Sequence, residues 1–343
     1  MKSKVGSAMG TVIAHVMVLL LVMCAAAMAA EPQVNQQSQK QPQLQLSEGE
    51  RKGVEKINTA VGADNKMKAA TEFIKKNAKS QIRNRVATYV AEEIVRVQNP
   101  QQIIALAQSY ISTFNLPEEA DLVKPALIDA LLNTGKFDEG LNEGTQYLQR
   151  HPEDVPVLIS IAWAGANQVQ KQAGTPKLTQ AANDASAKAV ELMEADKRPQ
   201  RMDEKTWAEY RNSWLPRLYQ ARGLMLYHGN LKSDAKDNLE KAAGLEPYDP
   251  STLMMLVNIT NEEYQDLAKK YQTEKKADIL NKAIEKMDEV IDWLARAVGA
   301  TEGNPQMQPT NQQLRENLQA YYSFRHEGKT EGMNELIEKY KKK

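Results

Sequence analysis

The chain has 343 residues, 44 basic and 44 acidic side chains, and only 6% aromatic residues. A formal net charge of zero provides no basic surface for nucleic acid, so nucleic acid is not an expected partner. Helix-forming residues dominate and no segment alternates like a β-strand, which predicts an all-α protein.

Residues 1–30 have the pattern of a secretory signal peptide. Two early lysines precede an apolar run from Val12 to Ala30, which ends in small residues. This order predicts cleavage after Ala29 or Ala30 and a periplasmic or secreted protein. The run also approaches the roughly 20 residues that span a bilayer. The alternative is an uncleaved protein that residues 11–30 anchor in the inner membrane.

The segment that follows differs from the rest of the chain. Residues 31–48 form a Gln-rich tract with two prolines. Such a tract lacks the apolar side chains that a core requires, and we expect a disordered linker. The only cysteine, Cys24, lies before it in the apolar run. A cleaved chain would therefore hold neither a disulfide nor a thiolate metal site.

From residue 49 the helical pattern is nearly continuous, with prolines and glycines at the breaks. The predicted helices are residues 49–62, 65–78, 82–97, 100–114, 118–134, 137–150, 154–171, 177–195, 203–228, 231–244, 250–272, 276–298, 310–325 and 329–341. We expect a helical repeat array over 49–300, with inserted sequence near 168–215. Residues 301–343 are expected to form a loop and capping helices.

A motif recurs every 37 residues in the first half of this array. Its aromatic residues are Phe73, Tyr110 and Tyr147, each followed by an aliphatic residue. A small residue stands three positions before each aromatic, and an apolar residue stands six positions before it. Those preceding residues are Ala70, Ala107 and Gly144, and Met67, Ile104 and Leu141. This period indicates stacked helical hairpins, in which each unit buries its apolar face against the next.

A later segment resembles the tetratricopeptide repeat (TPR) family. The residues that carry the resemblance are Gly223, Ala235, Leu239, Ala242 and Pro247. Residues 121–154 are similar more loosely, because glycines replace an alanine and an aromatic of the family pattern. The layout as a whole resembles secreted bacterial TPR proteins. The resemblance implies a right-handed superhelical solenoid of antiparallel helix pairs, with a concave groove that binds protein segments.

The family's groove positions can be carried over to this sequence. They fall on Asp129, Asn133, Ile159, Trp163, Asn167, Arg217, Gln220, Leu224, Tyr227 and His228. Family members that clamp the C-terminal carboxylate of chaperone peptides use lysines and asparagines at such places, and this chain lacks that set. The mixed apolar and polar lining favours extended or helical protein segments as partners.

Two further features concern aromatic residues. Trp207 and Trp214 lie seven residues apart on one face of the predicted helix 203–228. They are interpreted as packing residues, and a ligand-facing aromatic patch is the alternative. In the tail, an apolar face is expected to cap the array, and the lysine-rich end is expected to be solvated. That face consists of Leu314, Leu318, Tyr321, Tyr322 and Phe324.

No pattern predicts an enzyme, a cofactor site or a metal site. His151, His228 and His326 stand at predicted helix ends, and none is paired at metal-ligand spacing. Glycine-rich phosphate loops and nucleophile-elbow motifs do not occur. The favoured hypothesis is an exported, non-enzymatic scaffold that binds protein segments. The alternatives are a membrane-anchored envelope structural protein and a superhelical enzyme, such as a lytic glycosidase.

Overall fold

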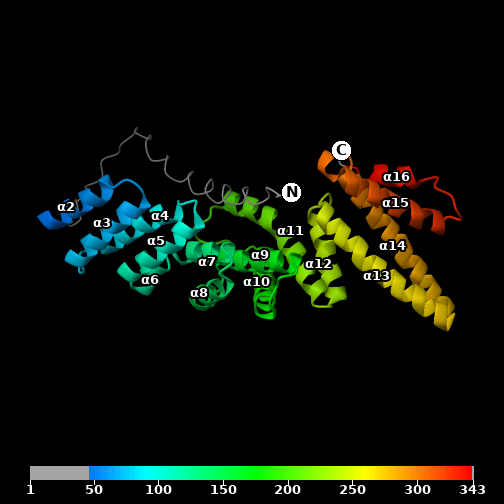
Figure 1. Cartoon of the computed structure of the whole chain (residues 1–343), viewed down its shortest axis with the longest axis horizontal. Helices are drawn as coiled ribbons and strands as arrows, with labels where there is room; N and C mark the ends of the chain where they lie inside the picture. Colours follow the sequence, from blue (N-terminus) through cyan, green and yellow to red (C-terminus); the bar gives the residue numbers. More distant parts are fainter. Residues whose placement is uncertain (1–45, 342–343) are drawn as a thin grey trace, which may run out of the picture. The chain divides into compact units, whose positions relative to one another are not determined.

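The computed structural model describes residues 46–341, which contain fifteen α-helices, one short 3-10 helix and no strand (Figure 1). The all-α prediction is therefore confirmed for this part of the chain. The predicted signal peptide, Cys24 and all but the last residues of the Gln-rich linker lie outside the described residues, and those predictions stay predictions.

All but one of the predicted helices correspond to a single observed helix, with ends that differ by at most four residues. The helices are α2 (Glu48–Thr59), α3 (Ala63–Lys76), α4 (Arg83–Val95), α5 (Pro100–Thr113), α6 (Pro117–Ala120), α7 (Lys124–Asn133), α8 (Phe137–Arg150), α9 (Val155–Gln170), α10 (Pro176–Glu194), α11 (Glu204–His228), α12 (Lys232–Leu245), α13 (Pro250–Glu274), α14 (Ala277–Thr301), α15 (Gln308–Arg325) and α16 (Met333–Lys339). The 3-10 helix η2 (Pro305–Met307) precedes α15.

The exception is the predicted helix 118–134, which is divided into α6 and α7. Pro125 is the second residue of α7 and has no N–H. A continuous helix would need that N–H to donate to the carbonyl of Asp121, and the proline ring would also clash there. The prediction of one helix was wrong for this reason.

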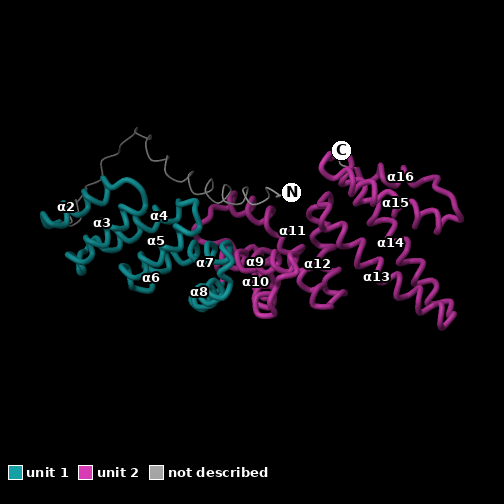
Figure 2. Tube along the Cα trace, in the orientation of Figure 1, with its two compact units in different colours: residues 1–152 teal, residues 153–343 magenta. Residues whose placement is uncertain are grey.

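The chain divides into two compact units, residues 1–152 and residues 153–343 (Figure 2). In unit 1, neighbouring helices pack as α2/α3, α4/α5 and α7/α8, α3 also contacts α4, and α5 also contacts α3 and α7. In unit 2 the pairs are α9/α10, α11/α12 and α13/α14, and α14 also contacts α15 and α16. Packing between neighbouring helix pairs is thus shown within each unit.

The 37-residue motif marks the second helix of each pair in unit 1. Phe73, Tyr110 and Tyr147 lie on α3, α5 and α8, and all three are buried. Their backbone carbonyls accept hydrogen bonds from the C-cap N–H groups of these helices. The motif therefore gives both the buried face and the end of each helix.

Glycines permit close approach of paired helices in unit 2. A Cβ at Gly223 of α11 would lie 2.6 Å from the Leu239 Cγ on α12. A Cβ at Gly165 of α9 would lie 2.1 Å from the Ala182 Cβ on α10. Both distances are below van der Waals contact, so each helix pair interlocks at a glycine.

Charged side chains inside the units were not anticipated. In unit 1, Glu119 has a side chain only 3% exposed and pairs with Arg83 through two hydrogen bonds of 2.7 and 2.9 Å. In unit 2, Lys236 of α12 joins Glu263 of α13 and Glu289 of α14, at 3.1 and 2.5 Å. These ion pairs connect different helices and fix their register.

Lys286 completes the unit 2 cluster, with its Nζ 2.9 Å from Glu263 and 2.8 Å from Glu289. Burial alone would raise the pKa of Glu289, but its hydrogen bonds to Lys236 and Lys286 outweigh burial and lower that pKa. The charged form of Glu289 is therefore the one that the folded state favours.

The C-terminal helices cover the end of unit 2. Leu314 and Leu318 of α15 are buried, as predicted for a cap. Phe324 was expected on the same face but is 75% exposed. Six residues separate Phe324 from Leu318, which places it about 120° around a helix of 3.6 residues per turn. Tyr340, just after α16, contacts α14: the Cζ of Arg296 lies 4.6 Å from the centre of the Tyr340 ring.

Candidate protein-binding site

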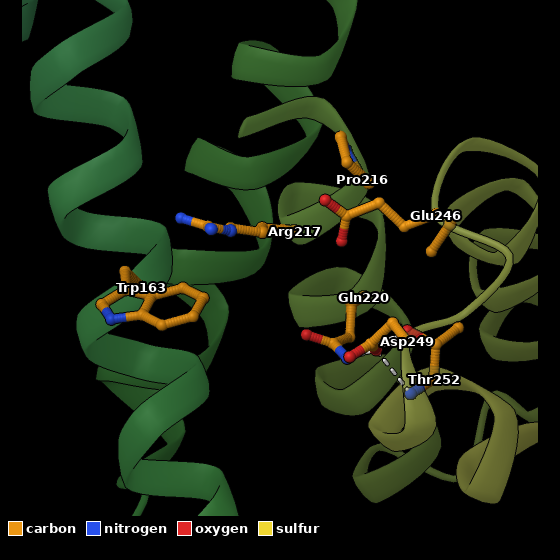
Figure 3. A pocket seen from close by; sticks show the side chains of 8 residues that line it. Trp163, Pro216, Arg217, Gln220, Glu246, Asp249 and Thr252 are labelled. Atoms are coloured by element: carbon orange, nitrogen blue, oxygen red, sulfur yellow. Dashed lines mark hydrogen bonds between the residues drawn. The ribbon is translucent and has the colours of Figure 1, made fainter. Parts of the chain in front are cut away.

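A hollow of about 170 Å³ opens in unit 2 (Figure 3). Its lining comes from α9, α11, the end of α12 and the start of α13. The lining residues are Trp163, Pro216, Arg217, Gln220, Ala242, Glu246, Asp249 and Thr252. Trp163, Arg217 and Gln220 are three of the ten residues predicted to face the groove, and the structure brings them together here.

A proline shapes the wall formed by α11. Pro216 lies inside this 25-residue helix. It cannot donate the hydrogen bond that the carbonyl of Asn212 would otherwise accept, and a proline in a helix interior favours a kink. Pro216 is itself buried, and Figure 3 shows it at the hollow next to Arg217. Pro216 therefore removes one backbone hydrogen bond of α11 at the hollow.

A hydrogen-bonded network holds the wall opposite Trp163. Asp249 is the N-cap of α13, and its Oδ2 accepts from the backbone N–H of Thr252 at 2.8 Å and from the Thr252 hydroxyl at 2.6 Å. The Gln220 amide donates to the same oxygen at 2.7 Å and to the Thr252 Oγ1 at 2.9 Å. One carboxylate thus starts α13 and ties it to α11.

The remaining polar groups of the hollow are available to a partner. The Arg217 guanidinium lies 5.5 Å from the ring centre of Trp214, and Arg217 has no ion-pair partner among residues 46–341. Glu246 has none within the same range. Figure 3 shows Arg217 extending toward Trp163 and Glu246 beside the same space. A cation, an anion and a half-buried indole therefore surround one small volume.

The indole belongs to a row of aromatic rings. Trp163 meets Trp214 edge to face at 5.9 Å, and Tyr210 lies 6.2 Å from Trp214 and 6.3 Å from Trp207. Trp207 and Trp214 are buried, and the Trp207 indole donates to Asp196 at 2.8 Å. The packing interpretation of these two tryptophans is confirmed. At the hollow, Trp214 supports the Trp163 ring.

The other unit 2 candidates do not line the hollow. The Tyr227 hydroxyl donates to Glu262, and this hydrogen bond, with burial, raises the pKa of Tyr227. His228 is exposed at the end of α11, and Asn167 is half-buried on α9. Leu224 packs against a small apolar cluster.

Ile159 also falls outside the hollow. It is 3% exposed, so the expectation that it faces a groove is wrong. Its position on α9 points it into the core of the helix pair, where an apolar side chain gains most from burial.

Asp129 and Asn133 lie on α7 in unit 1. The Asn133 amide donates to the Asp129 Oδ2 at 2.8 Å, one helical turn apart. The two polar side chains therefore bond to each other, and their presence on α7 can be explained without a bound partner. The two residues do not belong to the hollow of unit 2.

Sequence reasoning missed the part of the hollow formed by α12 and α13. Glu246, Asp249 and Thr252 surround two prolines, Pro247 and Pro250, in the connection between these helices. An aspartate directly before a proline is a recognisable helix start. That signal could have placed Asp249 at the N-cap, but it does not show which helix lies opposite.

Several negative findings apply to the described part of the chain. Between residues 46 and 341, no three His, Cys, Asp or Glu side chains cluster closely enough to hold a metal ion. In the same range, no helix combines the length and the apolar character needed to cross a membrane. A scan against protein-family models and a search of curated proteins both find no match to this chain.

Proposed function

We propose that this chain is an exported, non-enzymatic scaffold, built as a TPR-like right-handed solenoid, that binds protein segments. One observation carries the proposal. The hollow is lined by the first helices of three consecutive pairs, α9, α11 and α13, together with Ala242 and Glu246 at the end of α12. The groove positions that the TPR resemblance assigns also fall on first helices, and three of them meet in the hollow.

The size of the hollow favours a protein side chain over a small molecule. Pockets for drug-sized ligands and cofactors span about 300–1,000 Å³. The hollow has about 170 Å³, which suits one anchoring side chain of a longer segment. The rest of such a segment would lie across the neighbouring helices.

The chemistry of the hollow supports the same partner class. Tryptophan and arginine dominate the binding energy of protein interfaces. Trp163 offers an indole supported by Trp214, and the guanidinium of Arg217 lies over the Trp214 ring, with no ion-pair partner among residues 46–341. The Asp249 network keeps the opposite wall in place before a partner arrives, which lowers the ordering cost of binding.

Export is supported by the N-terminal pattern of lysines, apolar run and small residues. Mass spectrometry of the protein isolated from its native cells tests it. The expected first residue is Ala30 or Glu31. An intact Met1 would favour the anchored alternative instead, in which residues 11–30 stay in the membrane.

Affinity purification from envelope extract tests the binding proposal. Purified wild type, Trp163→Ala, Arg217→Glu and Arg201→Glu would be used as baits. Arg201 is an exposed arginine in the loop between α10 and α11 and does not line the hollow, so it makes a matched charge control. We expect a partner retained by wild type and Arg201→Glu and lost from the other two baits. Equal recovery on all four baits, or no partner on wild type, would contradict the proposal.

A further inference from the structure

Charge is unevenly distributed along this neutral chain. Between Phe73 and Ala91 the sequence contains five basic residues and no aspartate or glutamate. They lie at the end of α3, in the turn that follows and at the start of α4, and these two helices contact each other in unit 1. One end of the α3/α4 pair is therefore rich in basic side chains. The five are Lys75, Lys76, Lys79, Arg83 and Arg85.

Most of these cations have no anionic partner. Arg83 is engaged, because it pairs with the buried Glu119 of α6. Glu118, the residue before Glu119, is exposed and lies at the margin of this surface. The other four basic side chains are exposed and have no ion-pair partner among residues 46–341. These four, here called the basic turn, are Lys75, Lys76, Lys79 and Arg85.

The carboxylates of α2 and α3 do not neutralise the basic turn. Glu72 of α3 pairs with Lys56 of α2 at 2.5 Å. Glu50 of α2 accepts a hydrogen bond from the Ser80 hydroxyl at 2.5 Å, so the start of α2 lies beside the turn. The residue after it, Arg51, is a further exposed cation without an ion pair in the described part of the chain. This end of unit 1 therefore keeps an excess of positive charge.

The basic turn offers charge without an apolar anchor. Apart from the four cations, the exposed residues between 75 and 85 are Ala78, Gln81 and Asn84, and Ile82 is buried. Protein interfaces take most of their binding energy from aromatic and arginine side chains in desolvated pockets. Single-stranded nucleic acids are held by aromatic rings on which the bases stack. Residues 75–85 contain no aromatic residue, and this composition favours a surface of spread negative charge.

The position of the turn along the chain favours a membrane as that surface. The apolar run that ends at residue 30 enters a bilayer as a signal peptide during export, or stays there as an anchor. Fifteen residues separate it from Leu46, where the described chain begins. Fifteen residues span at most about 50 Å. Because the start of α2 lies beside the turn, the basic turn stays within reach of the membrane that holds the apolar run.

We propose that the basic turn docks unit 1 on a membrane surface that carries anionic lipid headgroups. The three lysines and Arg85 contact lipid phosphates, and each adds a modest attraction that sums over the cluster. This contact goes beyond the binding of protein segments and does not depend on the hollow of unit 2.

Vesicle flotation tests the proposal with the protein as isolated from its native cells. Vesicles of phosphatidylcholine alone are compared with vesicles that also contain about 30% phosphatidylglycerol. The first kind measures any binding through a retained apolar run. We expect binding to the anionic vesicles to be about tenfold stronger, and this gain to disappear as salt is added. Stronger binding to polyglutamate or to a DNA oligonucleotide, at the same concentration of negative charge, would overturn the assignment to a membrane.

Two variants locate the contact. Lys75→Gln/Lys76→Gln and Lys79→Gln/Arg85→Gln each remove two positive charges, and each is expected to weaken binding to the anionic vesicles about tenfold. Lys269→Gln/Lys270→Gln makes the same change at two exposed neighbours on α13 and is the matched control, expected to stay within about twofold of wild type. Circular dichroism checks that each variant is folded. Equal binding to both kinds of vesicle, unchanged binding by the first two variants, or an equal loss in the control overturns the proposal.

Discussion

The interlocking of helix pairs at glycines predicts a graded response to three Gly→Ala changes in unit 2. Gly244 of α12 has no heavy atom within 4 Å of an added Cβ. Gly223→Ala places its Cβ 2.6 Å from Leu239 and 3.1 Å from the Ala235 carbonyl oxygen, and Gly165→Ala places it 2.1 Å from the Ala182 Cβ. The three sites share the same chemical change and differ in the space around it.

The magnitudes follow from two opposing effects. Alanine in a helix interior is favoured over glycine by about 1 kcal/mol. Overpacking a close contact costs about 1–3 kcal/mol. Gly244→Ala should therefore stabilise unit 2 by about 0.5–1 kcal/mol, and Gly223→Ala should destabilise it by about 1 kcal/mol. Gly165→Ala should cost about 2 kcal/mol, because a Cβ on a helix cannot move aside unless the helices separate.

Urea unfolding followed by tryptophan fluorescence measures this in unit 2 alone. All four tryptophans of the chain lie there, at positions 163, 207, 214 and 293. The expected order of midpoints is Gly244→Ala, wild type, Gly223→Ala and Gly165→Ala, from highest to lowest. A midpoint for Gly165→Ala at or above that of wild type would refute the reasoning that α9 and α10 interlock at this glycine.

Two further predictions concern charged groups. Glu119→Gln should destabilise unit 1 by about 3 kcal/mol, because it leaves the Arg83 guanidinium, whose side chain is 17% exposed, without its anion. Chemical denaturation followed by circular dichroism measures this change, and a loss below about 1 kcal/mol would contradict the assignment. Because the folded-state pKa of Glu289 is lowered, its contribution is present above the ordinary value of 4.5 and is lost as pH falls through the folded pKa. Lys236→Met should therefore shift the acid unfolding of unit 2 to higher pH, and an unchanged midpoint in a fluorescence pH titration would count against this ion cluster.

Sequence periodicity was sufficient to locate most helices and their buried faces. Phe73, Tyr110 and Tyr147 are all buried because each belongs to a repeat of the same apolar pattern, which needs a neighbouring helix to cover it. Prolines were harder to interpret. Pro125 separates two helices, whereas Pro216 stays inside α11. The missing N–H and the clash of the ring disfavour a continuous helix at both places, but the helix is divided only at Pro125, so a proline alone does not predict where a helix ends.

The candidate site was only partly predictable. Trp163, Arg217 and Gln220 follow from helical spacing and the TPR resemblance, because such positions recur on one face of a first helix. Asp249 lines the hollow from the loop between α12 and α13. A loop has no repeating apolar pattern, so its position could not be predicted in this way. Ile159 was predicted to face the groove but is buried. A position carried over from a family identifies the helix on which a residue lies, but it does not show how that helix is rotated about its axis and so which side chains it buries.

Side chains that join distant segments were also beyond the sequence. Glu119 looks like an ordinary first-turn carboxylate, and only the position of Arg83, 36 residues earlier, shows it as half of a buried ion pair. Contacts of this kind are set by the packing of whole helices.

The central claim is that the unit 2 hollow receives a segment of another protein. Site-specific photo-crosslinking in native cells tests it most directly, with a benzophenone amino acid in place of Tyr248, an exposed residue between the lining residues Glu246 and Asp249, and, as a matched control, at position 201. We expect position 248 to join covalently to one defined peptide of another protein, and position 201 not to do so. Absence of a crosslink at 248, or the same products from both positions, would contradict the account.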